Sequence, residues 1–345
     1  MIESNAEKDG RVVSPAGNDF VAFENTLRPK TLEEYVGQKK IKDNLSISIM
    51  AADKRGEPLD HILLHGAPGL GKTTLAHVIA HEADVNIRIT SGPALEKQGD
   101  IASIISTLKD NDILFIDEIH RLKPIVEEIL YTAMEDYAID LVIGNGPSAK
   151  TVRLQLPKFT LIGATTKVSM LSSPLRDRFG NIFRLDFYEE TDISDIILRS
   201  AKILDFAVTQ ECADELSKSC RKTPRIANRL LKRVRDYAEV KHEAKLSIEI
   251  LNKALRAIGV DETGLDQIDR QILETIMLKF RGGPVGLNTL SAATNEDQST
   301  VEDVYEPFLI QMGFLERTSR GRIATPRAYQ HLNIPDPQAQ KPLQI

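Results

Sequence analysis

Tryptophan is missing from the sequence, and cysteine is nearly so, with only Cys212 and Cys220 in a chain of 345 residues. Two cysteines are too few for a disulfide framework or for the four ligands of a structural zinc site, and this scarcity indicates a reducing compartment. The chain also lacks an apolar signal segment and any run that approaches the ~20 apolar residues of a bilayer span. We therefore expect a cytoplasmic protein that has no contact with a membrane.

An excess of basic charge is absent as well. The formal net charge is −6 at pH 7, so any contact with nucleic acid has to be confined to a local patch. The chain has 41% hydrophobic and 27% charged residues, which is ordinary for a globular protein and too apolar for a disordered one. Because one domain usually takes ~100–200 residues, the length predicts two or three domains.

The first long segment, residues 25–188, alternates strand-length apolar runs with helical patterns. This alternation predicts an α/β domain, a parallel sheet with flanking helices. Residues 1–24 and 335–345 show no apolar periodicity and are expected to be flexible tails. The expected strands are 62–65, 87–90, 113–116 and 159–163, and the helices between them begin near Thr73, Gly99 and Ile125.

Two smaller units follow this domain. In residues 189–260 the strand patterns stop and apolar residues recur at i, i+3 and i+4, which predicts an all-helical domain. Residues 261–334 predict helices near 269–280 and 300–311, then two short strands on either side of Ser319-Arg320-Gly321. Helices followed by a glycine-tipped hairpin are typical of a winged helix. The expected helices of the first unit are 192–204, 213–219, 225–240 and 248–258, and the expected strands of the second are 314–318 and 322–325.

Residues 66–73 read GAPGLGKT and fit the phosphate-binding pattern G-x-x-x-x-G-K-[ST]. Glycines such as Gly69 and Gly71 let backbone N–H groups surround phosphate oxygens, and the N-terminus of the following helix favours anions. Lys72 is expected to reach the β- and γ-phosphates, and the Thr73 hydroxyl to bind Mg²⁺. A glycine-rich turn that binds nothing is the alternative, and the strand before the motif and the helix after it disfavour that alternative.

An acidic pair, Asp117 and Glu118, ends the apolar run 113–116 and fits a Walker B segment. Asp117 is expected to hold the Mg²⁺ shell, and Glu118 to act as the general base that activates the attacking water. Acidic pairs at strand ends are also common on protein surfaces, so this function depends on the phosphate-binding loop. Together the two motifs predict ATP hydrolysis.

Three later segments carry side chains suited to a γ-phosphate. Gly163-Ala164-Thr165-Thr166 ends the next strand and would bring its hydroxyls, such as that of Thr166, close to the nucleotide. The loop 173–179 contains Arg178, and arginine suits phosphate because its guanidinium stays charged and forks onto oxygens. Arg225 begins a helix of the second unit and could face the nucleotide across a cleft. Taken singly, each segment also fits an ordinary solvated loop or helix.

In this order the motifs resemble the Walker A, Walker B, sensor 1, arginine finger and sensor 2 of AAA+ ATPases. Several longer stretches resemble the RuvB family within that class, and together they cover the chain from about residue 27 to 334. These stretches are 27–30, 37–38, 117–122, 163–166, 173–180, 223–229 and 282–287.

The resemblance implies an AAA+ core, a helical lid and a DNA-binding winged helix in a ring, usually hexameric, that moves duplex DNA through a Holliday junction. It implies ATP and ADP as ligands with Mg²⁺, RuvA as the junction-binding partner, and a RuvC-type resolvase as a further possible partner. Arg178 matches an arginine finger that acts on the neighbouring subunit's nucleotide. The positions that match nucleotide-binding residues are Leu27, Arg28, Gly69, Leu70, Gly71, Lys72, Thr73, Thr74, Glu135, Asp136, Tyr137, Arg178, Tyr188 and Arg225.

A hairpin is predicted over residues 139–156, where Gly144-Asn145-Gly146-Pro147 separates two alternating apolar runs. The family resemblance implies that this hairpin projects to RuvA through exposed apolar residues such as Val152 and Leu154. The residues themselves indicate a hairpin and say nothing about its partner.

The C-terminal hairpin reverses the overall charge of the chain. Residues 313–330 contain four arginines, among them Arg317, Arg320 and Arg322, against the single acid Glu316. A tip with this composition is expected to lay guanidinium groups along phosphates with little reading of sequence. The resemblance assigns duplex-DNA contact to Arg317 and Arg322, and a solvated basic hairpin is the alternative.

Rival functions remain open at this stage. A clamp-loader subunit shares the nucleotide motifs, but its C-terminal region is typically a helical collar rather than a hairpin with a Gly-Arg tip. A nucleotide switch that does not hydrolyse ATP would have no need of Glu118. Asp117-Glu118-Ile119-His120 also suggests a DExH helicase, a class that requires a second RecA-like core, and residues 189–334 show no pattern for one.

Overall fold

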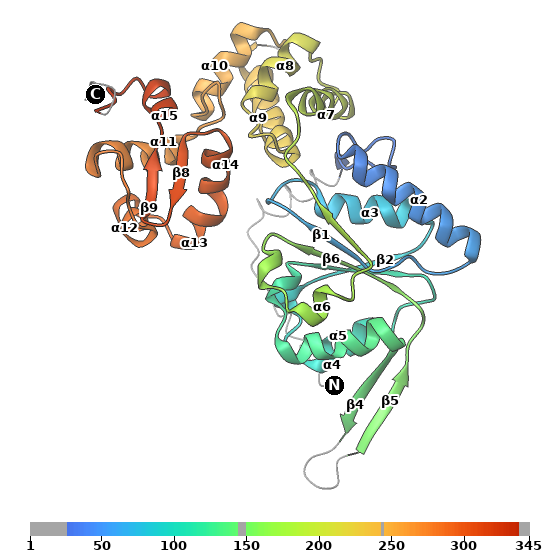
Figure 1. Ribbon diagram of the computed structural model, residues 1–345. Coiled ribbons are helices and arrows are strands. Elements are labelled where there is room, and N and C mark those ends of the chain that lie inside the picture. The colour runs from blue at the N-terminus through green and yellow to red at the C-terminus, as the bar shows by residue number, and fades with distance from the viewer. Residues whose placement is uncertain (1–25, 144–149, 243–244, 338–345) are drawn as a thin grey trace, which may run out of the picture.

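A computed structural model describes residues 26–143, 150–242 and 245–337 (Figure 1). Its centre is a five-stranded parallel sheet in the order β2-β3-β6-β1-β7. The predicted strands appear with small shifts at their ends, and β7 is an edge strand that the sequence patterns did not predict. The strands are β1 Ile62–His65, β2 Ile87–Ser91, β3 Ile113–Asp117, β6 Thr160–Thr165 and β7 Asn181–Arg184.

Helices cover both faces of this sheet, as expected for parallel strands. One face packs against α2 (Lys39–Arg55) and α3 (Lys72–Glu82). The opposite face packs against α4 (Gln98–Ile105) and α5 (Pro124–Asp136), with the short α6 (Ser173–Arg176) beside them (Figure 1). Because β1 and β3 lie on either side of β6, their carboxyl ends meet at one edge of the sheet, where a ligand site is expected in this class of fold.

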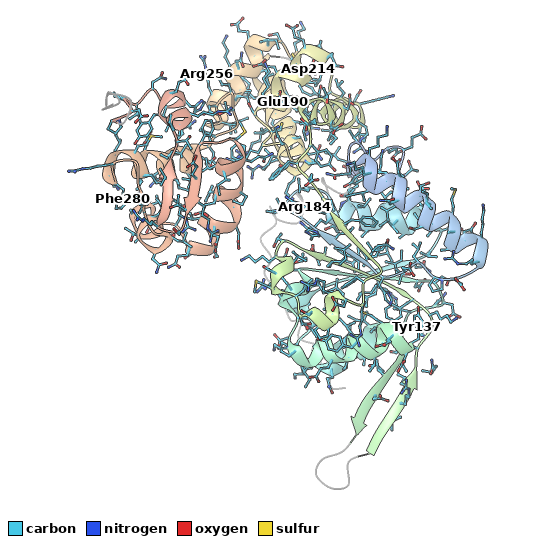
Figure 2. The ribbon with its side chains drawn as sticks, in the orientation of Figure 1. Tyr137, Arg184, Glu190, Asp214, Arg256 and Phe280 are labelled. Atoms are coloured by element: carbon cyan, nitrogen blue, oxygen red, sulfur yellow. The ribbon has the colours of Figure 1, made fainter. Side chains whose placement is uncertain are left out.

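An antiparallel hairpin of β4 (Ala138–Ile143) and β5 (Lys150–Gln155) follows α5. Tyr137 lies at its base, and its outer part stands apart from the rest of the domain (Figure 2). The predicted hairpin is thus present over residues 138–155. Its Gly-Asn-Gly-Pro tip lies outside the described residues.

The second unit is all-helical, as predicted. It contains α7 (Glu190–Ile203), α8 (Gln210–Lys218), α9 (Pro224–His242) and α10 (Ile248–Ile258). Their apolar faces join the cluster that also contains α2, α3 and one face of the sheet, so the helical unit continues the core of the ATPase domain. The described part of residues 189–334 has no second parallel sheet, and this excludes the DExH alternative for these residues.

The third unit is a winged helix with a core of its own. The two predicted helices are present, but each contains a π-helical turn, at Thr275–Lys279 and Val301–Tyr305. The hairpin of β8 (Leu315–Thr318) and β9 (Gly321–Ala324) forms the wing, and Val285 bridges to Arg322 beside it. The helices are α11 Gln267–Glu274, α12 Leu287–Thr294, α13 Gln298–Thr300, α14 Glu306–Gln311 and α15 Pro326–His331.

Specific polar contacts join the winged helix to the other units. Arg221 of the helical unit contacts Asp266 and Asp269 at the start of α11. Lys167, two residues beyond β6, forms an ion pair of 2.8 Å with Asp303. Within the described ranges, every helix is too short or too polar to span a bilayer.

Candidate functional site

The phosphate-binding loop runs from the end of β1 to Lys72, the first residue of α3. The Lys72 ammonium donates hydrogen bonds of 2.9 Å to the carbonyl oxygens of Gly66 and Ala67. Burial lowers the pKa of Lys72 to about 8, and the nearby carboxylates of Asp117 and Glu118 oppose this shift. A buried ammonium at a helix N-terminus therefore faces the loop, as phosphate binding requires.

Two glycines of this loop are required by its geometry. Gly69 has a φ of 82°, and a Cβ there would lie 3.2 Å from the Cβ of Arg225. Gly71 has a φ of 95°, and its Cβ would lie 2.9 Å from the Tyr35 hydroxyl. Both values fall where side chains are disfavoured. The loop can approach α9 and Tyr35 closely because these positions carry no side chain.

The acidic pair lies at the carboxyl end of β3. The Thr73 hydroxyl donates a long hydrogen bond of 3.4 Å to Asp117 Oδ2, while Asp117 Oδ1 accepts one of 3.0 Å from the Glu118 N–H. Glu118 itself has a φ of 49° and turns the chain into a 3₁₀ helix, Ile119–Arg121. These oxygens form a short, hard-ligand cluster beside the loop, suited to a divalent cation.

A cavity of about 190 Å³ brings the predicted nucleotide residues together. Its wall combines the phosphate-binding loop, the acidic pair, Thr166 and the first residues of α9. The predicted residues that line it are Leu27, Arg28, Gly69, Gly71, Lys72, Thr73, Thr74, Asp117, Glu118, Thr166, Tyr188 and Arg225.

Tyr35, Arg199 and Asn228 are among the wall residues that were not predicted to bind nucleotide. Arg199 donates to the carbonyl oxygens of Leu27 (2.6 Å) and Glu34 (3.2 Å), so it holds the N-terminal segment against the cavity. Tyr35 lies before α2 and Arg199 lies on α7, and no local motif marks either residue. Asn228 lies on α9 three residues after Arg225, within the stretch 223–229 that resembles the family, and this proximity is a signal that could have found it.

Leu70 is buried beneath the cavity rather than in its wall, and its carbonyl oxygen accepts a hydrogen bond from Tyr188 at 3.2 Å. Burial raises the pKa of Tyr188 to about 12, so this phenol stays neutral and acts as a donor. The two residues tie the phosphate-binding loop to the segment that leads into α7.

The remaining predicted nucleotide residues form a second group, away from the cavity wall. Arg178 donates to Glu135 at 2.8 Å and lies over the Tyr131 ring at 4.9 Å. Asp136 pairs with Arg153 at 2.7 Å, and Tyr137 follows it at the end of α5. Within one subunit, this group and the cavity are separate.

The two threonines that end β6 take different positions. Thr166 lines the cavity, as predicted. Thr165 is fully buried, and its hydroxyl lies 2.8 Å from His120 Nδ1. Of the two hydroxyls in this segment, only that of Thr166 therefore lies in the cavity wall.

The wing requires a correction to the expected arginine arrangement. The Arg317 side chain is exposed and pairs with Glu302 at 2.9 Å. The Arg322 side chain is only 9% exposed, and its guanidinium pairs with Glu306, which is 2% exposed. The two arginines face each other across the hairpin register, yet Arg322 points into the winged-helix core. The resemblance implied duplex-DNA contact for both arginines, and the structure places only the Arg317 guanidinium on the surface.

The apolar residues predicted on the long hairpin are exposed. Val152 is 46% exposed and Leu154 is 39% exposed, and both lie on one face of β5. Ile139, opposite Leu154, is buried at the base. The hairpin thus offers apolar side chains to solvent beyond the domain core.

Comparison with known proteins matches three family models end to end along the chain. The model "Holliday junction DNA helicase RuvB P-loop domain" matches residues 27–185, the "RuvB AAA lid domain" matches 188–261, and the "RuvB C-terminal winged helix domain" matches 262–333.

Individual relatives match over nearly the whole chain. The Holliday junction branch migration complex subunit RuvB of Dehalococcoides mccartyi is 57% identical over 329 residues, which are 95% of this chain and 94% of that protein. The structure of Thermotoga maritima RuvB, described as a Holliday junction branch migration motor, is 49% identical with a TM-score of 0.82 and covers 90% of this chain and 100% of its own. A mutant of the same protein is 50% identical with a TM-score of 0.83, over 90% of this chain and 99% of that one.

Proposed function

The chain belongs to the RuvB family, and from that premise we propose that it is an ATP-hydrolysing motor that drives branch migration of Holliday junctions in DNA recombination and repair. The observation that carries this proposal is the single cavity in which the phosphate-binding loop, the acidic pair and Arg225 meet. The proposal divides the chain into an ATPase domain (25–188), a helical lid (189–260) and a DNA-binding winged helix (261–334), with tails at 1–24 and 335–345.

The residues around the cavity fit a nucleoside triphosphate with Mg²⁺. Lys72 is a buried cation whose present partners are neutral carbonyl oxygens, so a phosphate is a better partner for its charge. Thr73 and Asp117 supply the hydroxyl and carboxylate oxygens that Mg²⁺ prefers. Bound Mg²⁺ would neutralise charge that develops on the phosphates. Thr166 would contact the γ-phosphate, and Glu118 would take the proton of the attacking water.

Lid and core share the cavity, which suggests how hydrolysis moves the domains. Arg225 is the second residue of α9 and its side chain packs beside Gly69, so an arginine of the lid lines the cavity next to the phosphate-binding loop. Loss of the γ-phosphate would remove the charge that attracts this arginine. The lid position would then depend on whether ATP or ADP is bound.

Arg178 supports the proposal that the protein works as a ring. Its guanidinium lies outside its own cavity and pairs with Glu135, whose chain neighbours are Asp136 and Tyr137. An arginine finger in trans requires this separation, with the finger group of one subunit facing the nucleotide of the next. The family's hexameric ring is the assembly that we propose.

DNA and partner contacts complete the proposal. The wing would hold duplex DNA, with Arg317 on the phosphates and Arg322 at the second family position, where its pairing with Glu306 sets the shape of the wing. Val152 and Leu154 would bind a RuvA-type junction protein. A RuvC-type resolvase would act on the junction that the complex moves.

Mixing two inactive variants tests the shared site. Glu118→Gln and Arg178→Ala should each lose ATP turnover, because one removes the base and the other the finger. A mixture of the two should regain part of the activity, since some interfaces then combine an intact base with an intact finger. Full turnover by Arg178→Ala as an isolated monomer would refute the shared site. Migration of a synthetic four-way junction with ATP, with and without RuvA, tests the motor function directly.

A further inference from the structure

His120 lies between the acidic pair and the end of β6, with its side chain only 5% exposed. Its Nε2 is 3.4 Å from Glu118 Oε2, and its Nδ1 is 2.8 Å from the Thr165 hydroxyl. The backbone N–H of Lys167 donates to that same hydroxyl at 2.9 Å. A short chain of polar groups therefore ends on the carboxylate that we assign as the base.

The position of the ring proton follows from the groups that the two ring nitrogens face. Burial lowers the pKa of His120 against the opposing charge of Glu118, so the ring is neutral and carries one proton. Nε2 faces the Glu118 carboxylate, which can only accept, so the single ring proton is placed on Nε2. Nδ1 then accepts from the Thr165 hydroxyl, whose oxygen accepts from the Lys167 N–H.

The local backbone explains why the ring is in this position. Glu118 adopts the left-handed conformation, and the chain then forms the 3₁₀ turn Ile119–Arg121. Ile119 is fully buried in the core beneath the sheet and fixes this turn. The turn brings the His120 ring into contact with Thr165 on one side and with Glu118, two residues earlier in the chain, on the other.

We propose that His120 is a positioning residue for ATP hydrolysis, and that its Nε2–H holds the Glu118 carboxylate in the orientation that accepts the proton of water. The inference rests on the proposed role of Glu118 as the base. A carboxylate that is 37% exposed has several rotamers open to it, and a fixed donor on one oxygen selects among them. The other oxygen stays available for the proton transfer. Thr165 stabilises this tautomer of His120 through the hydrogen bond to Nδ1, so it affects Glu118 only through His120.

Two amide substitutions separate the two ring nitrogens. The amide nitrogen of His120→Gln falls near the position of Nε2, whereas that of His120→Asn falls near Nδ1. We expect His120→Ala and His120→Asn to lower kcat about tenfold with the Kd for ATP within about twofold, and His120→Gln to stay within about threefold of the parent kcat. Equal kcat in all four proteins would overturn the inference. Variants that lose kcat and ATP affinity to the same extent would also overturn it, because such losses indicate a purely structural role for the histidine.

A second set of variants tests the role of Thr165. Thr165→Val removes the hydroxyl at nearly constant volume, and Thr165→Ser retains it. If both residues act through Glu118, the double variant His120→Asn with Thr165→Val should turn over no more slowly than the slower single variant. Multiplied losses would mean that the two residues act independently, against the proposed chain. Thr165→Ser should stay near the parent value.

The histidine ring can also be observed without turnover. In the full-length protein with ¹⁵N-labelled histidine, His120→Gln identifies the His120 signals by difference among the seven histidines. The expected pattern is a protonated Nε2 and an unprotonated Nδ1, and Thr165→Val should change it. The opposite tautomer would overturn the inference.

Glu118→Gln distinguishes failure of the inference from failure of the proposed function. If Glu118→Gln keeps full turnover, Glu118 is not the base, and the proposed chemistry falls together with the role of His120. If Glu118→Gln abolishes turnover while the His120 variants keep it, only the inference about His120 falls.

Discussion

Lys167 and Asp303 form an ion pair of 2.8 Å that joins the ATPase domain to the winged helix. Each residue has an immediate neighbour at a proposed functional position. Thr166 lines the nucleotide cavity, and Glu302 pairs with Arg317 of the wing at 2.9 Å. The proposed nucleotide and DNA positions are therefore linked through two consecutive acidic residues.

Reversing this ion pair should loosen the winged helix from the ATPase domain. Lys167→Glu places two negative charges together, and a partly exposed pair of this kind contributes about 0.2–1 kcal/mol. We expect up to about a fivefold shift toward conformers with the domains apart, measured by energy transfer between dyes on α4 and α12. Combining Lys167→Glu with Asp303→Lys should reverse the shift. Lys123→Glu, which affects an exposed pair inside the ATPase domain, should leave the distance unchanged.

The two wing arginines should respond differently to substitution. Arg317→Ala should weaken duplex binding about equally across sequences and reduce the salt slope by about one, with the thermal midpoint unchanged. Arg322→Ala leaves the buried Glu306 with only the more distant Arg317, at 3.9 Å, and should destabilise the winged helix by about 3 kcal/mol. Adding Glu306→Leu should recover much of that stability. A stable Arg322→Ala protein with weakened DNA binding would instead place Arg322 on the phosphates.

Asp269 should make the stability of the contact between the lid and the winged helix depend on pH. Burial outweighs the neighbouring Arg221 and raises the pKa of Asp269 to about 7. The folded state then binds a proton that the unfolded state has already lost, so this group's contribution to stability falls as pH rises from about 4 to 7. Asp269→Asn stays neutral, so its free energy of unfolding relative to the parent should rise by about 1 kcal/mol between pH 6 and 8, as measured by calorimetry.

Asp214→Asn is the matched control for that measurement. Hydrogen bonds from Ser194 and Gln210 hold the pKa of Asp214, on α8, below its ordinary value. Asp214 is therefore ionised throughout pH 6–8, and its variant should differ from the parent by a constant amount. A constant difference for Asp269→Asn as well would show that Asp269 is ionised in the folded protein.

Replacing exposed apolar residues of the long hairpin with polar ones should weaken partner binding and leave ATP hydrolysis unchanged. Val152→Ser with Leu154→Ser removes the exposed apolar side chains of one face, so we expect RuvA to bind at least tenfold more weakly. Basal ATPase should be unchanged, because the hairpin lies outside the cavity wall. Gln155→Ala, on the other face of the strand, should bind RuvA normally in the same titration. Unchanged RuvA binding by the double variant would move the contact elsewhere.

The sequence predicted the parts of the molecule that local patterns determine. Four sheet strands follow from short apolar runs, and the phosphate-binding loop follows from its own spacing. The edge strand β7 has no such run, because only Phe183 among its residues is buried. Tyr35 and Arg199 come from segments far from the nucleotide motifs, and tertiary packing alone brings them to the cavity.

The wing shows the limit of reading charge from a sequence. Arg317 and Arg322 look alike in a basic hairpin, but the partner that separates them, Glu306, begins a helix sixteen positions before Arg322. The same holds for His120 and Thr165, which lie 45 positions apart and meet only because β3 and β6 are neighbours. Pairings of this kind depend on strand order, which composition does not encode.

Gly92 begins a 3₁₀ turn directly after β2, outside the cavity wall, and it packs against the backbone of Glu118. A methyl group at this position would collide with the carbonyl oxygen of Glu118, whose backbone is already in the left-handed region. Even alanine at this position would displace the backbone of Glu118, the proposed base, although Gly92 is not part of the cavity wall. A substitution in the short turn after β2 that lowers ATPase activity would then act by a steric clash with the Glu118 backbone. Such a variant would still bind ATP and DNA, but it would not hydrolyse the ATP and so would not move the DNA.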